Sequence, residues 1–185
     1  MLPAFIYLII RISVENNMND YNLEAIRARY QLVPRTLVFI RNNDSYLLIH
    51  KAKKDSYGFG KLNGIGGHME KGEDPYQSAR REIREETGLV IDALELAAIL
   101  LIDINANPGI QVFIFRTQWA GGELSSTLEG ELLWVERELI QDNDKVVKDL
   151  PFLIEQMEAY KSGTPPRIIQ YSYDEFEQLR IAIVM

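Results

Sequence analysis

The chain has 185 residues, of which 46% are apolar and 25% are charged, and this length and composition suit one globular domain. It contains no cysteine, which excludes a disulfide framework and a thiolate zinc site and is compatible with a reducing cytoplasm. The formal net charge of -7 argues against a broad surface for polymeric nucleic acid, which would need a basic patch.

Residues 1–33 are predicted to form an N-terminal extension of a single domain that comprises residues 34–185. Residues 2–10 are apolar, but this run is less than half the length that spans a bilayer, and it lacks the basic residue and cleavage site of a signal peptide. Three interpretations stay open: an added strand, an interaction segment, or upstream sequence before a true start at Met18. Apolar residues at helical spacing between residues 21 and 33 predict a short helix.

A β-hairpin is predicted at the start of the domain. Residues 36–40 and 46–50 are rich in β-forming side chains and flank the turn-forming run 42–45. Both runs are almost continuously apolar, which predicts a sheet that is covered on both faces. Five glycines follow within residues 58–67, so this backbone must bend sharply or lie directly against a ligand.

Residues 75–87 carry the start and stop signals of a helix. Asp74 can accept the free amide protons of the first turn, Pro75 is tolerated at the first helical position, and Gln77 completes a capping-box pattern. Gly88 stands where a left-handed C-cap is expected. The glycine-rich loop is therefore predicted to lead into this helix.

The glutamates of this helix have the spacing of a metal site. Glu82, Glu85 and Glu86 are related as i, i+3 and i+4, so their carboxylates project from one side of the helix. Three acidic groups this close repel one another unless a cation lies between them, and oxygen ligands favour Mg²⁺ or Mn²⁺ over zinc. The alternative is a solvated helix face on which Arg81 and Glu85 form an ordinary pair, worth about 0.3 to 0.5 kcal/mol.

The rest of the chain predicts three further strands, a helix and a last strand. Residues 97–104 and 111–116 are predicted strands joined by a turn-rich loop, and residues 132–135 form the next strand. Residues 150–161 carry apolar side chains at helical spacing, and residues 167–173 are predicted to be the final strand.

The segment from Gly67 to Leu89 fills every fixed position of the pattern G-x5-E-x7-R-E-U-x-E-E-x-G-U, in which U is apolar. In this it resembles the Nudix hydrolase family. The resemblance implies an α/β fold of the α+β kind, an α/β/α sandwich with a central mixed β-sheet. It also implies hydrolysis of a nucleoside diphosphate linked to another moiety.

The same resemblance implies roles for the residues of this segment. Glu82, Glu85 and Glu86 are expected to bind Mg²⁺, or Mn²⁺, with help from a backbone carbonyl at Gly66 or Gly67. Two further residues, Arg81 and Glu73, are expected to orient this carboxylate cluster. Of the glutamates just before the strand at residues 132–135, Glu129 is expected to add a metal contact or act as the general base, with Glu131 as the fallback.

The residues on either side of this segment, Gly-Phe-Gly at 58–60 with Leu-Asn-Gly-Ile-Gly-Gly at 62–67 and Val-Ile-Asp-Ala-Leu at 90–94, resemble the MutT-like branch of the family. That branch removes oxidised purine nucleoside triphosphates. In that branch the residues that match Asn63 and Asp149 read the base, and Phe59 is a candidate to pack against it. The chain departs from the branch at residues 145–148, where such relatives commonly carry a tryptophan. Without that aromatic platform the base would lose stacking worth about 1 to 3 kcal/mol.

The expected function is metal-dependent hydrolysis of a nucleoside triphosphate, such as 8-oxo-dGTP, to a nucleoside monophosphate and pyrophosphate. Two alternatives stay open: a Nudix pyrophosphatase for another nucleoside diphosphate derivative, and a non-catalytic binding or regulatory module. The expected partner is a small nucleotide rather than a membrane or polymeric nucleic acid. A cytoplasmic location is expected, and a homodimer remains open.

Overall fold

The computed structural model describes residues 22–52, 57–125 and 129–184, which fall into two compact units divided after Tyr30. In the first unit, α1 (Leu23–Arg27) begins where the Asn22 side chain accepts a hydrogen bond from the Ala25 amide, and it buries no side chain. The helix predicted between residues 21 and 33 is thus only five residues long. The interpretations of residues 2–10 and of Met18 lie outside the described residues.

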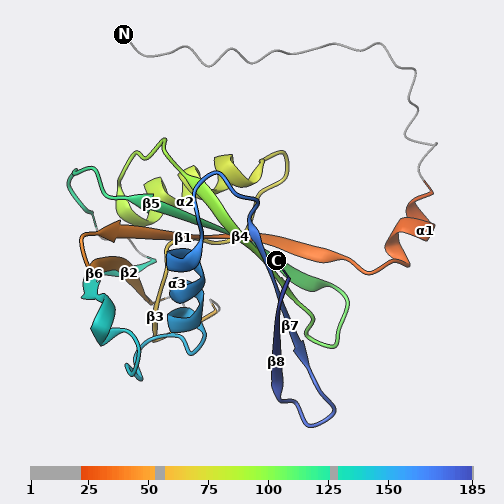
Figure 1. The fold of residues 1–185 in the computed structure, drawn as a ribbon. Helices are drawn as coiled ribbons and strands as arrows, with labels where there is room; N and C mark the ends of the chain where they lie inside the picture. The colour runs from red at the N-terminus through yellow and green to blue at the C-terminus, as the bar shows by residue number, and fades with distance from the viewer. Residues whose placement is uncertain (1–21, 53–56, 126–128, 185) are drawn as a thin grey trace, which may run out of the picture. The chain divides into compact units, whose positions relative to one another are not determined.

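The second unit is built on one mixed sheet (Figure 1). Its strands are β1 (Leu32–Asn42), β2 (Ser45–Lys51), β3 (Leu62–Asn63), β4 (Glu95–Ile102), β5 (Gly109–Gln118), β6 (Gly130–Glu136), β7 (Arg167–Tyr173) and β8 (Leu179–Val184). They lie in the order β3-β2-β1-β5-β4-β7-β8, with β6 paired to β2. The β1–β5 and β4–β7 pairs are parallel and the other pairs are antiparallel, which confirms the predicted mixed sheet.

The predicted hairpin is formed by β1 and β2, in which Asn42 pairs with Ser45. Two residues, Asn43 and Asp44, make the turn, and Asn43 adopts a φ of 51°. Asparagine tolerates this left-handed conformation better than most residues, so the sequence of the turn matches its geometry.

The predicted helix after the glycine-rich loop is α2 (Pro75–Thr87), with the expected bounds. The Asp74 carboxylate accepts the Gln77 amide at 2.9 Å, and the Gln77 side chain accepts the Asp74 amide at 3.0 Å. Gly88 ends the helix with a φ of 76°. These local signals confirm the predicted capping box and the glycine C-cap.

Helices cover both faces of the sheet (Figure 1). Ala79 and Ile83 of α2 pack in a core cluster with Val38 of β1. The neighbouring Phe39 belongs to a second cluster, which contains Leu153 of α3 (Leu150–Ala159). Successive residues of a strand point to opposite faces, so β1 contributes to both cores and the α/β/α sandwich is confirmed.

The structure also differs from the prediction. The strand at residues 167–173 is not the last, because β8 pairs antiparallel with it. All six residues of β8 are exposed. The strand lies at the edge of the sheet, and its sequence has no alternation of buried and exposed residues from which it could be predicted. Two short elements were also not predicted: β3 within the glycine-rich loop, and a 3₁₀ turn at Arg137–Leu139. Within the described ranges, no helix is long and apolar enough to span a membrane.

Candidate active site

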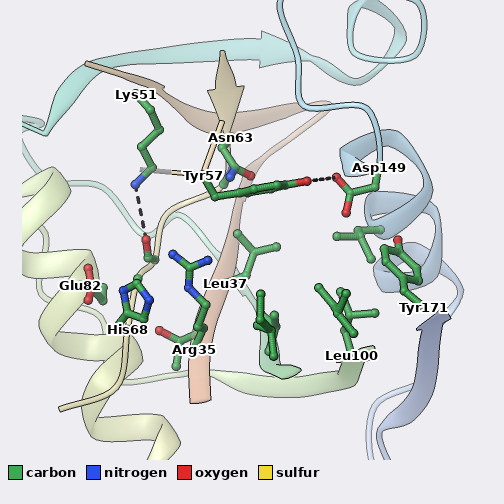
Figure 2. Close-up of a pocket in the computed structure, with 18 of the residues that line it drawn as sticks. Arg35, Leu37, Lys51, Tyr57, Asn63, His68, Glu82, Leu100, Asp149 and Tyr171 are labelled. Carbon is green, nitrogen blue, oxygen red and sulfur yellow. Dashed lines mark hydrogen bonds between the residues drawn. The ribbon is translucent and has the colours of Figure 1, made fainter. Parts of the chain in front are cut away.

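A pocket of about 730 Å³ opens beside β1 and lies between α2 and the β7–β8 hairpin. Figure 2 shows charged side chains, among them Lys51, Arg35 and Glu82, at one end of this pocket. Asp149 and Tyr171 lie at the other end, and the wall between is apolar, with Leu37 and Leu100 among its residues. Residues that were predicted from separate parts of the sequence therefore line one cavity: Asn63, Gly66, Gly67, Glu82, Glu85, Glu86, Glu129 and Asp149.

Two glycines bring the loop against β1 and α2. Gly66 has a φ of 145°, and a Cβ there would lie 2.2 Å from the Thr36 carbonyl oxygen. A Cβ on Gly67 would lie 2.6 Å from Oε1 of Glu82. The Gly67 carbonyl accepts the Thr36 amide at 2.9 Å, whereas the Gly66 carbonyl faces the Lys51 ammonium at 3.4 Å. Of the two carbonyls predicted to help a metal, that of Gly66 is thus turned toward a cation.

Arg81 holds three carboxylates together. Its guanidinium forms a two-point pair with Glu73, at 2.7 and 3.1 Å. It also donates to Glu82 at 2.9 Å, to Glu85 at 3.1 Å and to the His68 carbonyl at 2.9 Å. The hydrogen bond from Arg81 lowers the pKa of Glu73, whereas burial raises the pKa of Glu82 against the pull of Arg81. The Arg81–Glu73 pair that the sequence suggested is therefore present beside the glutamates.

Glu86 lies in the interior, with only 3% of its side chain exposed. It forms an ion pair with Lys51, and its second oxygen accepts the Gly66 amide at 2.9 Å. Burial raises the pKa of Glu86, and the ammonium of Lys51 opposes this shift. Glu86 thus points away from Glu85, which is more than half exposed.

The three helix glutamates do not form a ready metal cluster. Among the described residues, no group of three or more His, Cys, Asp or Glu side chains is placed to hold an ion. Arg81 engages Glu82 and Glu85, and Lys51 engages Glu86. Nevertheless the donor set fits a hard divalent cation. All the donors are oxygens. Burial raises the pKa of the partly buried Glu82 and of the buried Glu86, and a cation would stabilise their charged forms.

Glu129 lines the pocket and directly precedes β6. Its carbonyl accepts the Ala52 amide at 3.0 Å, and the pairing of Gly130 with Lys51 fixes this stretch beside β2. The fallback, Glu131, is exposed and does not line the pocket. Pairing of β2 with β6 therefore separates two glutamates that the sequence alone left as alternatives.

At the opposite end, Asp149 precedes α3 and accepts a hydrogen bond from the Tyr57 hydroxyl at 3.4 Å (Figure 2). Partial burial raises the pKa of Asp149. Partial burial and the nearby Asp149 raise the pKa of Tyr57 to about 12. The Asn63 side-chain oxygen accepts the Gly64 amide at 2.8 Å. The third predicted residue, Phe59, does not line the pocket. Tyr57 does, although the two rings are exposed to a similar degree, 59% for Tyr57 and 50% for Phe59.

Tyr57, Arg35 and Lys51 are among the pocket residues that sequence reasoning missed. Tyr57 supplies an aromatic ring near Asp149. The stretch in which relatives of the MutT-like branch commonly carry a tryptophan holds the buried Val146 and Val147 in this chain. Arg35 of β1 reaches the charged end, where burial lowers its pKa while Glu82 raises it. Lys51 ends an apolar strand. A charged residue within or at the end of an apolar run was the available signal for both cations.

The family model of the NUDIX domain matches residues 31–155. The chain is 31% identical over 134 residues to the oxidized purine nucleoside triphosphate hydrolase of Danio rerio, covering 69% of this chain and 86% of that protein. It is 28% identical over 149 residues to the protein of the same name from Mus musculus, covering 77% and 94%. A solved MutT protein from Bacillus halodurans shares the fold, with a TM-score of 0.59, 22% identity and coverage of 82% and 97%. The chain therefore belongs to the Nudix hydrolase family and is a MutT-like member of it.

Proposed function

We propose that this Nudix hydrolase converts an oxidised purine nucleoside triphosphate, such as 8-oxo-dGTP, to its monophosphate and pyrophosphate. The observation that carries this proposal is that one pocket joins a carboxylate end at Glu82 and Glu86 to an apolar wall that ends at Asp149. The names of the Danio rerio and Mus musculus relatives support the same substrate class. The proposed enzyme domain is residues 34–185, which nearly coincides with the compact unit 31–185.

At the carboxylate end, Glu82, Glu85 and Glu86 would hold Mg²⁺ or Mn²⁺ with the carbonyl of Gly66 or Gly67. When bound, this ion supplies positive charge for the phosphates and lowers the pKa of a water molecule. Arg81 keeps Glu82 and Glu85 in place, and Glu73 keeps Arg81 in place through its two-point pair. These contacts fix the carboxylates before substrate arrives.

The reaction itself needs one proton acceptor. The oxygen of the attacking water forms a bond to one phosphorus of the α–β anhydride, and the bond from that phosphorus to the bridging oxygen breaks. The other product, pyrophosphate or monophosphate, leaves with the bridging oxygen and the electron pair of that bond, and the water proton passes to Glu129. Glu129 lines the same pocket as the helix glutamates, from the turn just before β6. Arg35 lies at this end as well, where its positive charge would face the phosphate chain.

At the other end, Asn63 and Asp149 would read the purine edge and Tyr57 would pack against its ring. Asp149 lines the pocket, and its carboxylate accepts a hydrogen bond from the Tyr57 hydroxyl, so one carboxyl group with several acceptor positions faces the purine edge. An oxidised purine differs from a normal one in its pattern of donors and acceptors, so such a group can discriminate between them. Tyr57 supplies the aromatic surface that the missing tryptophan would have given.

A panel of nucleotides tests this proposal. Purified protein with Mg²⁺ is incubated with 8-oxo-dGTP, normal nucleoside triphosphates, ADP-ribose and a dinucleoside polyphosphate, and the products are separated by chromatography. We expect monophosphate and pyrophosphate from 8-oxo-dGTP, and Glu86→Gln should abolish their formation. Turnover of ADP-ribose alone would favour the other pyrophosphatase function. No turnover of any substrate, with nucleotide binding retained, would favour the non-catalytic module.

A further inference from the structure

Lys51 places a positive charge in the interior of the domain. Only 7% of its side chain is exposed, and the side chain of its partner Glu86 is 3% exposed. An ammonium group is costly to bury unless it is paired, so the ion pair with Glu86 is what makes this position tolerable. Lys51 comes from β2 and Glu86 from α2, so the pair also joins the sheet to the helix.

The Lys51 ammonium contacts oxygen atoms that a bound metal would also need as ligands. It bonds Glu86 Oε1 and lies 3.4 Å from the Gly66 carbonyl oxygen. These are a carboxylate and a carbonyl oxygen, the ligands that a hard divalent cation prefers. Arg81 reaches Glu73, Glu82 and Glu85, and within the described parts of the chain the ion pair of Glu86 is with Lys51. The two cations thus divide the carboxylates between them.

We propose that Lys51 is an internal counter-ion that holds the place of the divalent metal and is displaced when the metal binds. The inference rests on the proposed metal dependence. A divalent ion and an ammonium that share the same oxygens repel each other at short range, so both do not occupy Glu86 together. Displacement releases the ammonium into the pocket, whose substrate carries negative phosphates.

Such competition raises the apparent Kd for the metal, because only those molecules in which the Lys51–Glu86 ion pair is broken can bind it. If the Lys51–Glu86 pair is formed about 90% of the time, the apparent Kd for metal is raised about tenfold. In return, the metal-free protein avoids an unpaired carboxylate in its interior. Metal binding and the position of the lysine side chain are therefore coupled.

Calorimetric titration with Mn²⁺ tests this coupling without substrate. Lys51→Met should bind Mn²⁺ with a Kd about tenfold lower than the wild-type protein. Lys148→Met is the matched control, because Lys148 also lines the pocket but is exposed, and among the described residues it forms no ion pair with the helix glutamates. Its Kd should stay within about twofold, since an exposed charge is screened by salt. An unchanged or weaker Kd for Lys51→Met would overturn the inference and indicate a purely structural lysine.

A second measurement uses the wild-type protein and so does not depend on how the variant folds. Lysine acetylation by a small amine-reactive reagent is followed at each residue by peptide mass spectrometry, with and without Mn²⁺. Labelling of Lys51 should rise severalfold with Mn²⁺, while that of Lys148 stays constant. Mn²⁺ binding with unchanged Lys51 labelling would refute this inference alone. Absence of any Mn²⁺ binding would refute the proposed metal dependence as well, and loss of the 8-oxo-dGTP activity alone would refute only the proposed substrate.

Discussion

The Tyr57 hydroxyl donates a hydrogen bond to the Asp149 carboxylate, at 3.4 Å, at the end of the pocket away from the helix glutamates. Tyr57 comes from the loop before β3 and Asp149 from the start of α3, so the bond joins two segments far apart in the sequence. It places an aromatic ring beside the acidic group that is proposed to read the base. Tyr57, rather than Phe59, therefore joins Tyr171 as an aromatic residue at this end.

Replacing Tyr57 by alanine should weaken substrate binding. Loss of base stacking costs about 1 to 3 kcal/mol, so KM for 8-oxo-dGTP should rise roughly 5-fold to 150-fold while kcat changes little. Tyr57→Phe keeps the ring and should stay close to the wild type. The control is Phe59→Ala, because Phe59 does not line the pocket. Steady-state kinetics that show the larger KM effect at Phe59 would reverse this assignment.

Asp149→Asn should stabilise the fold at neutral pH. Burial raises the folded-state pKa of Asp149 above its ordinary value of 3.8, so the folded protein holds this proton more tightly than the unfolded chain. Stability is then lost as the pH rises from about 3.8 through the folded pKa, because the partly buried carboxyl group must ionise. The neutral asparagine avoids this loss.

Urea unfolding at several pH values checks this expectation. The variant should be more stable than the wild type at pH 7, and the difference should shrink as the pH is lowered toward the ordinary pKa of aspartate. Glu175→Gln, on the exposed β7–β8 turn, should show no such convergence. A difference between Asp149→Asn and the wild type that grows toward low pH would show that the ionised carboxylate stabilises the fold.

Arg81→Lys should lower kcat even though the positive charge is kept. A lysine cannot reproduce the two-point pair with Glu73 and the bonds to Glu82 and Glu85. Loss of groups that orient metal ligands typically costs about 10-fold to 100-fold in activity or metal affinity. The neighbouring Arg80→Lys is the control, since Arg80 bonds the Asp92 carbonyl and does not line the pocket. Equal kcat in both variants would argue against the orienting role.

Gly66→Ala should destabilise the domain strongly. The added Cβ would meet the Thr36 carbonyl oxygen at 2.2 Å, so the loop could not stay against β1. Gly60→Ala is the control, because its φ of 72° is also left-handed but its Cβ would meet nothing within 4 Å. We expect a loss of about 1 to 2 kcal/mol at Gly60 and a clearly larger loss at Gly66 in urea unfolding. Similar losses would mean that the loop moves freely away from the strand.

Local sequence signals predicted part of this structure well. The bounds of α2 followed from Asp74, Gln77 and Gly88, because caps and C-caps are formed by residues a few positions apart. The edge strand β8 was not predicted, since it buries no face whose alternation could be recognised. The hydrophobic pattern thus predicted the strands that bury many side chains, but it failed to predict the exposed strand at the edge of the sheet.

The site residues likewise fall into those that local sequence patterns revealed and those that depend on the folded structure. The glutamates of α2 were found by their spacing along one helix, and Asn63 and Asp149 by resemblance. Lys51, Arg35 and Tyr57 were missed because their places in the pocket depend on contacts between distant segments, such as the ion pair from β2 to α2. The choice of Glu129 over Glu131 likewise needed the pairing of β6 with β2.

The most direct test of the proposed function is the ratio of kcat/KM for 8-oxo-dGTP to that for dGTP, measured with Mg²⁺ for the wild type and for Asp149→Asn. The account predicts that the wild type prefers 8-oxo-dGTP by at least about tenfold, equivalent to about 1.4 kcal/mol of discrimination. It also predicts that the substitution reduces this preference. Equal kcat/KM values for the two nucleotides in the wild-type protein, or a preference unaffected by Asp149→Asn, would contradict it.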